Sequence, residues 1–127
     1  HGALLIGASG SGKSTVALHM IALGCDLVAD DQTEISHMKT GLVATCPDTI
    51  QGRIEARGFG ILDAVAQPRC ILCCCVDLDK LEKNRLPPER FIKLCTQNLR
   101  LFHKPGIEVL PFALLQYLKT QSSLPTE

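Results

Sequence analysis

The most informative stretch of the chain is Gly7-Ala8-Ser9-Gly10-Ser11-Gly12-Lys13-Ser14, which matches the pattern G-x-x-x-x-G-K-[ST]. The apolar run Ala3-Leu4-Leu5-Ile6 precedes it, and apolar residues follow it at helical spacing from Val16 to Leu23. A buried strand, a glycine-rich loop and an amphipathic helix in this order are the context in which the pattern forms a phosphate-binding loop. The stretch therefore predicts an α/β domain that binds a nucleotide.

The residue types of this loop explain how it would bind phosphate. Glycines let the backbone curl so that successive N–H groups face a polyphosphate, and the N-terminal end of the helix adds partial positive charge. We expect Lys13 to reach the β- and γ-phosphates and the Ser14 hydroxyl to hold Mg²⁺. The predicted nucleotide-binding residues are Gly7, Ala8, Ser9, Gly10, Ser11, Gly12, Lys13, Ser14 and Thr15.

Composition and charge exclude several classes of protein. The 127 residues, of which 46% are hydrophobic and 20% charged, predict one folded domain over residues 1–127 and not a disordered chain. Thirteen basic residues balance thirteen acidic ones, which weighs against binding to nucleic acid or to an anionic membrane surface, because both need a basic surplus. No apolar run approaches the roughly 18 residues that span a bilayer.

Seven cysteines are present, and four of them crowd into residues 70–76. Cys70 and Cys73 have the spacing of a zinc or redox pair, but no second pair or neighbouring His completes a set of four ligands. We interpret these cysteines as small buried hydrophobic residues of a core strand. Free thiols are typical of a reducing compartment, which predicts a cytoplasmic protein.

Other apolar runs and turn residues predict the remaining elements. A buried strand at 27–29 would complete a β-α-β unit, and a hairpin is expected across residues 39–41. A short strand is predicted at 54–57 and an exposed, mobile loop at 77–88. In the C-terminal part, Pro88 is expected to open a helix whose apolar stripe comprises Phe91, Ile92, Leu94 and Cys95. A strand is predicted around Leu99 and Leu101, and a last helix is expected to begin at Pro111.

Two places offer the carboxylate that a phosphate-loop protein needs. Asp77 follows the cysteine-rich strand, and Asp30-Asp31 follows the predicted strand at 27–29. In a β-α-β unit the second strand lies near the first, so Asp30 and Asp31 are expected to share a crevice with the loop. One of them could hold metal while the other accepts a hydroxyl proton, whereas the alternative is that they only cap a turn.

The sequence alone gives little support for a functional role of Glu55 or Arg85. Glu55 and Arg57 lie two apart on a short strand, where a surface pair is the simplest interpretation. Arg85 lies in the predicted loop, where a cation could close over a transferring phosphate but an arginine is more often simply solvated.

Three motifs together resemble the HPr kinase/phosphorylase family. These are the phosphate loop, Leu27-Val28-Ala29-Asp30-Asp31 with Glu34, and Ile54-Glu55-Ala56-Arg57-Gly58-Phe59-Gly60-Ile61. The resemblance covers residues 2 to about 65 and is looser through Leu78-Asp79 and Asn84-Arg85-Leu86-Pro87, where it is similar to short forms that keep only the catalytic domain.

This resemblance implies a fold, a reaction and partners. The fold would be α/β, a phosphate-loop domain related to phosphoenolpyruvate carboxykinase, with a mixed sheet and flanking helices. The reaction would be ATP- and Mg²⁺-dependent phosphorylation of a serine of HPr, the small phosphocarrier protein of the bacterial sugar phosphotransferase system. The family also runs the reverse reaction with inorganic phosphate, releasing pyrophosphate, and its longer members are hexamers.

The resemblance also implies a role for individual residues. Lys13 and the loop amides would hold the β-phosphate, and Ser14 and Glu55 would bind Mg²⁺. Asp30 would be the catalytic base, with Asp31 supporting it, and Arg85 would stabilise charge on the transferring group. The chain departs from the family at Thr15, where an acidic residue is common, and in its poorly matched C-terminal part.

Two other readings stay open from the sequence. The first is a small-molecule kinase or general phosphate-loop ATPase, in which Asp77 would be the metal carboxylate. The second is a nucleotide-sensing module without turnover.

Overall fold

The computed structural model describes residues 1–30, 32–47, 51–106 and 108–123, so Asp31 lies outside the described residues. The elements in chain order are β1 (Gly2–Ile6), α1 (Lys13–Ala22), β2 (Glu34–Met38), β3 (Gly41–Thr45), β4 (Arg53–Ala56), β5 (Gly60–Asp63), β6 (Arg69–Leu81), β7 (Arg90–Leu94), β8 (Gln97–Lys104) and α2 (Leu110–Ser123).

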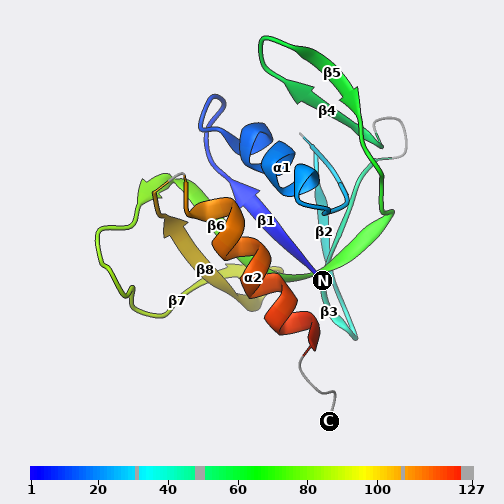
Figure 1. Ribbon diagram of the computed structural model, residues 1–127. Coiled ribbons are helices and arrows are strands. Elements are labelled where there is room, and N and C mark those ends of the chain that lie inside the picture. The colour runs from blue at the N-terminus through cyan, green and yellow to red at the C-terminus, as the bar shows by residue number, and fades with distance from the viewer. Residues whose placement is uncertain (31, 48–50, 107, 124–127) are drawn as a thin grey trace.

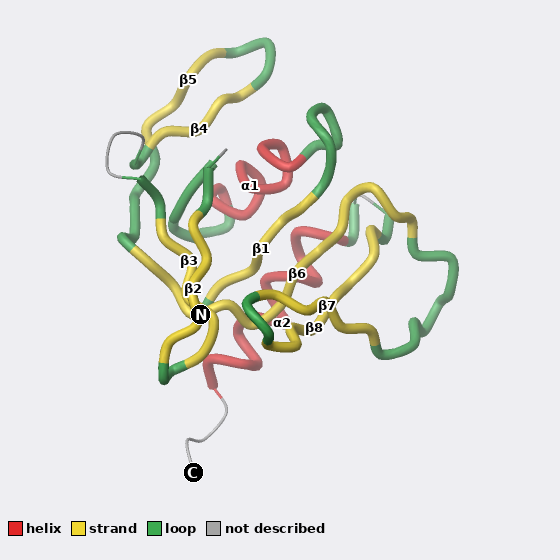
Figure 2. The backbone as a smooth tube through the Cα atoms, turned by 180° about the vertical axis from the view of Figure 1, so that it is seen from behind, coloured by secondary structure: helices red, strands yellow, loops and turns green. Residues whose placement is uncertain are grey.

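A six-stranded mixed sheet forms the body of the domain (Figure 1). Its strand order is β2-β3-β6-β8-β7, and β1 also pairs with β6. Both β1 and β8 run parallel to β6, whereas β2 with β3, β3 with β6, and β7 with β8 pair antiparallel. The hairpin β4–β5 stands apart from this sheet and projects beyond α1, as Figures 1 and 2 show from opposite sides. The expected α/β fold, a mixed sheet with flanking helices, is confirmed.

Both helices pack on the same face of the sheet. Val16 and Met20 of α1 and Leu110 and Leu114 of α2 form one buried cluster with alternate residues of β6. A second cluster, formed by residues of β3, β6 and β8, lies on the other face, because successive side chains of a strand point to opposite faces. The middle of β6, residues 70–76, is consequently covered on both faces, which explains its cysteine-rich, uniformly apolar sequence.

Pattern-based predictions for the N-terminal half are mostly confirmed. The β2–β3 hairpin turns at Gly41, whose φ of 130° favours glycine, and β4 and β5 form the short hairpin after it. The predicted strand at 27–29 is wrong, because only Leu27 forms a bridge, to Ala66. The strand that pairs with β1 is instead β6.

Two predictions for the C-terminal half are wrong. Residues 77–81 do not belong to a loop, because β6 continues to Leu81 and its Asp77 pairs with Ile6 on one side and His103 on the other. The helix expected after Pro88 is instead strand β7, which pairs with β8 across a two-residue turn. The predicted strand at Leu99 and Leu101 and the last helix, with Pro111 in its first turn, are confirmed. Within the described residues, neither helix is long and apolar enough to cross a membrane.

Candidate active site

The glycine-rich loop connects β1 directly to α1. Gly7, Gly10 and Gly12 have φ values of 154°, 86° and 99°, a region of backbone conformation that side-chain-bearing residues rarely adopt. A Cβ atom at Gly7 would also lie only 2.5 Å from Oγ of Ser11. Glycine at this position is therefore required both by backbone conformation and by space. The loop ends at Gly12, where α1 begins with Lys13.

Internal hydrogen bonds hold this loop in shape. The Nζ atom of Lys13 donates to the carbonyl of Gly7 at 2.6 Å, and the amide of Ser11 donates to the carbonyl of Ala8 at 3.0 Å. The lysine ammonium thus lies back across the loop that it follows in sequence. Ser9, Gly10 and Thr15 are exposed. This arrangement of curled amides and one ammonium is the geometry that cradles a polyphosphate.

Asp30 lies against the N-terminal turn of α1. The Ser14 hydroxyl donates to Oδ1 of Asp30 at 2.7 Å, and the backbone amide of Glu55 donates to Oδ2 at 3.1 Å. The carboxylate is therefore oriented by α1 on one side and by β4 on the other. Because the Ser14 proton points at Asp30, the lone pairs of the hydroxyl remain free to accept a cation.

Asp30 lies beside the loop, as predicted, but for a different reason. Residues 27–29 are not the second strand of a β-α-β unit, yet the hydrogen bond to Ser14 brings Asp30 to the loop. Glu55 joins the same group through the backbone of β4, and its exposed side chain lines a cavity of 430 Å³ together with Ser14 and Thr15. Ser14, Asp30 and Glu55 thus come from three separate elements.

Arg85 is not brought to this group. It lies exposed in the loop between β6 and β7, at the side of the domain in Figure 2, and no hydrogen bond or ion pair among the described residues links it to the phosphate loop. Arg57 is likewise exposed, at the turn of the β4–β5 hairpin. Asp31 lies outside the described residues, so its predicted role stays a prediction.

One carboxylate near the end of β6, that of Asp79, also contacts the loop, and a second, that of Asp77, bonds to Asp79. The amide of Ala8 donates to Oδ2 of Asp79 at 2.8 Å, and the amide of Asp79 donates to Oδ1 of Asp77 at 2.9 Å. Sequence reasoning missed Asp79 because residues 77–88 were read as a loop. The alternation Asp77-Leu78-Asp79 after a buried run was the available signal, since it places both carboxylates on one face of a continuing strand.

The donor set suits Mg²⁺ bound together with nucleotide. Oxygen atoms of Ser14 and Glu55 are hard ligands of the kind that Mg²⁺ prefers, and Mg²⁺ usually takes one or two protein ligands plus substrate phosphates. Among the described residues, no group of three or more His, Cys, Asp or Glu side chains could hold a metal ion without such help. We therefore expect the metal to arrive with the nucleotide.

The cysteines of residues 70–76 have the properties of core residues, whereas Cys95 is exposed. No disulfide is formed among the described residues, and burial raises the pKa of both Cys70 and Cys73 above the ordinary value of 9.0. A thiol that binds metal or reacts as a redox group requires a lowered pKa instead. Burial likewise raises the pKa of Cys74 to about 12 and that of Cys75 to about 12.

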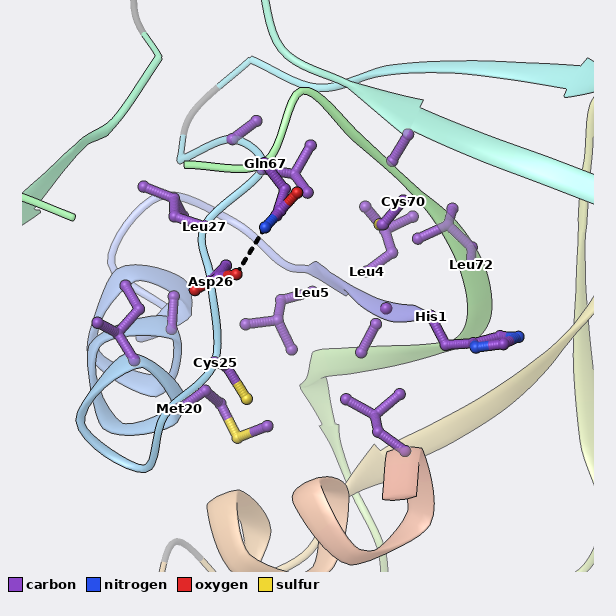
Figure 3. A pocket seen from close by; sticks show the side chains of 18 of the residues that line it. His1, Leu4, Leu5, Met20, Cys25, Asp26, Leu27, Gln67, Cys70 and Leu72 are labelled. Carbon is purple, nitrogen blue, oxygen red and sulfur yellow. Dashed lines mark hydrogen bonds between the residues drawn. The ribbon is translucent and has the colours of Figure 1, made fainter. Parts of the chain in front are cut away.

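A second cavity, of 510 Å³, lies beside β1 and extends to Lys13 and Asp30 (Figure 3). Most of its lining is apolar, and most of it comes from β1, α1, α2 and the segment from Cys25 to Asp30. Its wall also contains a hydrogen bond of 2.8 Å from Nε2 of Gln67 to Oδ2 of Asp26, marked in Figure 3. Lys13 and Asp30 belong both to this lining and to the hydrogen bonds of the phosphate loop.

Comparison with known proteins agrees with this geometry. The family described as the HPr Serine kinase C-terminal domain matches residues 1–67. The chain is 46% identical over 63 residues to the HPr kinase/phosphorylase of Bordetella petrii, and the matched region covers 49% of this chain and 20% of the relative. It is 48% identical over 65 residues to that of Exiguobacterium sibiricum, covering 50% of this chain and 21% of the relative. The chain thus spans about a fifth of the length of the curated relatives that it matches.

A solved structure extends the similarity to the rest of the chain. The Hpr(Ser) kinase/phosphatase from Coxiella burnetii superposes with a TM-score of 0.77 and 23% identity, covering 97% of this chain and 91% of that one. At this level of identity the similarity shows the fold, including the C-terminal part that the family match does not reach. With more than half of its residues matched by the family profile, the chain belongs to the HPr serine kinase C-terminal domain family.

Proposed function

We propose that this domain is an ATP- and Mg²⁺-dependent protein-serine kinase/phosphorylase that acts on HPr, the phosphocarrier of the sugar phosphotransferase system. The observation that carries the proposal is the hydrogen bond of 2.7 Å between Ser14 and Asp30, which sets a carboxylate beside a phosphate loop. The names of its relatives, HPr kinase/phosphorylase, support HPr as the acceptor.

In the forward reaction, a serine hydroxyl of HPr attacks the γ-phosphorus of ATP in line. The new O–P bond forms as the bond to the β-phosphate oxygen breaks, and ADP leaves. Asp30 accepts the serine proton, and the loop amides with Lys13 bind the β-phosphate. Ser14 and Glu55 would hold Mg²⁺, which offsets charge on the phosphate oxygens when bound.

In the reverse reaction, inorganic phosphate attacks the phosphorus of phosphoserine. The serine oxygen leaves with the proton that Asp30 returns, and pyrophosphate forms at the phosphate loop. The same carboxylate therefore acts as base in one direction and as acid in the other. Asp30 suits both roles because Ser14 and Glu55 fix its orientation.

Further parts of the proposal rest on the family resemblance. Arg85 would stabilise charge on the transferring group, which requires its exposed loop to approach the nucleotide. Asp31 would support Asp30. We also propose that residues 1–127 form one catalytic domain, that the assembly is a hexamer, and that the protein acts in the cytoplasm.

The proposal is tested with purified protein, HPr, Mg²⁺ and γ-labelled ATP. The wild type is expected to form one acid-stable phosphoserine on HPr, identified by mass spectrometry. Lys13→Ala should reduce both nucleotide affinity and phosphotransfer, whereas the matched variant Lys39→Ala, in the exposed β2–β3 turn, should retain both.

Other results would favour the competing readings. Nucleotide binding without label on any acceptor would indicate a sensing module. Label on a small molecule, together with Mg²⁺ dependence that is lost in Asp77→Asn but kept in Ser14→Ala, would indicate a general phosphate-loop kinase or ATPase.

A further inference from the structure

One amide of the phosphate loop already binds an anion of the protein itself. The N–H group of Ala8 donates to Oδ2 of Asp79 at 2.8 Å. The other carboxylate oxygen, Oδ1, lies 3.4 Å from the point where a Cβ of Gly7 would stand. Both oxygens of Asp79 therefore lie against the start of the phosphate loop.

A hydrogen bond to Asp77 holds Asp79 in this position. Its backbone amide donates to Oδ1 of Asp77 at 2.9 Å, and Asp77 is fixed in the sheet by pairing with Ile6 and His103. The ladder between β6 and β8 shifts register between Asp77 and Leu81, so Asp79 lies in an irregular stretch of the strand. Such irregularities commonly re-aim a side chain beside a functional site.

Asp79 differs in charge from the partners of the Ser11 amide and the Lys13 ammonium. These two groups bond to neutral carbonyl oxygens, of Ala8 and Gly7. Among the backbone amides of the loop with described partners, only that of Ala8 faces a carboxylate, whereas the Asp30 carboxylate bonds to the loop through the Ser14 hydroxyl. A phosphate oxygen that accepted from the Ala8 amide would carry the same sign of charge as Asp79, so the two anions could not occupy this amide together.

We propose that the Asp79 carboxylate competes with the polyphosphate for the Ala8 amide. This competition sets the affinity of the loop for nucleotide and pyrophosphate. The inference rests on the proposed function and deepens it, because it identifies a residue that tunes binding of phosphate-bearing substrates. A ligand binds by displacing the carboxylate from the Ala8 amide. Removal of Asp79 therefore strengthens binding of polyphosphates and leaves binding of phosphate-free adenosine unchanged.

The test compares Asp79→Ala, Asp79→Asn and Asp77→Asn with the wild type. Asp77→Asn removes an equal charge from the same strand end and keeps an oxygen for the Asp79 amide, so it controls for long-range electrostatics. Dissociation constants of ADP and pyrophosphate are measured by calorimetry at 0.15 M salt with EDTA. Hydrogen exchange of the Ala8 amide is measured in parallel, and thermal unfolding checks that each variant is folded.

We expect Asp79→Ala to bind ADP and pyrophosphate about three- to tenfold more tightly, from the typical strength of one hydrogen bond. Asp77→Asn should change these constants less than about twofold, because the Asp77 carboxylate bonds to the Asp79 amide and not to an amide of the loop. The Ala8 amide should exchange faster in Asp79→Ala. Affinities equal to those of Asp77→Asn, or weaker than wild type, would overturn the inference alone. Failure of every protein, wild type included, to bind either ligand would overturn the proposed function as well.

Discussion

Substitution of Ser14 by Ala tests the link between the phosphate loop and Asp30. It removes a hydrogen bond of 2.7 Å to a carboxylate, a class of bond that contributes about 1.5–3 kcal/mol. Both side chains are half-buried, so water can reach the carboxylate and the lower value applies. Alanine recovers about 0.5 kcal/mol through its higher helix propensity. The net loss in the free energy of unfolding is about 1 kcal/mol, which lowers Tm by about 4 °C for a domain of this size.

Ser11→Ala is the matched control, because it makes the same change three positions earlier. The Ser11 hydroxyl is buried and has no hydrogen-bond partner among the described residues, so its removal should leave Tm unchanged or raise it. Thermal unfolding followed by circular dichroism without ligand measures both variants. Equal Tm values for the two would show that the hydroxyl of Ser14 contributes nothing through Asp30.

Ser14→Ala is also expected to weaken the effect of Mg²⁺ on ADP binding. In EDTA, Ser14→Ala should bind ADP within about twofold of wild type, because the loop amides and Lys13 are intact. The gain in ADP affinity on adding Mg²⁺ should fall about tenfold, since one metal ligand is lost. Titration calorimetry with and without Mg²⁺ measures this gain. An unchanged gain would refute the assignment of Ser14 as a metal ligand.

Two further predictions concern the loop and the cysteines. Gly7→Ala should abolish nucleotide binding. At Gly10 an added Cβ atom would meet no atom within 4 Å, so Gly10→Ala should weaken binding only through backbone strain. Calorimetry with ADP distinguishes the two variants, and equal losses of affinity would contradict the crowding at Gly7. Iodoacetamide at pH 8 should label the exposed Cys95 and leave Cys74 and Cys75 unmodified, because a pKa of about 12 leaves only ~1 in 10⁴ of these thiols ionised. Labelling of Cys74 and Cys75 should increase when the pH is raised above 8 or when the protein is unfolded. Fast labelling of Cys74 in the native protein at pH 8 would contradict its burial.

Local signals were sufficient for the N-terminal half of the fold and for much of the site. The phosphate loop, the hairpin at Gly41 and the strand at β4 each combine a short apolar pattern with glycine at a position that needs it. These features depend on neighbours in sequence. The position of Asp30 beside Ser14 was also predicted, although the element expected to carry it, a strand at 27–29, is absent.

Strand β7 could not be recognised from the same signals. The spacing of its apolar residues fits a helix, and its turn consists of Cys95 and Thr96, with φ values of 48° and 64°. Two-residue hairpin turns of this kind normally carry Gly or Asn, so no turn signal is present. The strand exists because it pairs along β8, which is tertiary context that overrides local preference.

Asp79 was missed for a related reason. The charged residues after Val76 suggest an exposed loop, but β6 continues to Leu81, with Asp77 paired to both β1 and β8 and Leu81 paired to β8. Its contact with Ala8 joins positions 71 residues apart. Contacts of this range depend on the sheet topology, which local patterns do not contain.

The role of Asp30 as the base is tested most directly by measuring, for Asp30→Asn, both the turnover of HPr phosphorylation and the affinity for ADP. Asp63→Asn, an exposed carboxylate on β5, serves as the control. We predict that kcat falls by about 10²- to 10⁴-fold while Kd for ADP stays within about threefold of wild type. A kcat within tenfold of that of Asp63→Asn, or a loss of turnover matched by an equal loss of ADP affinity, would contradict this role.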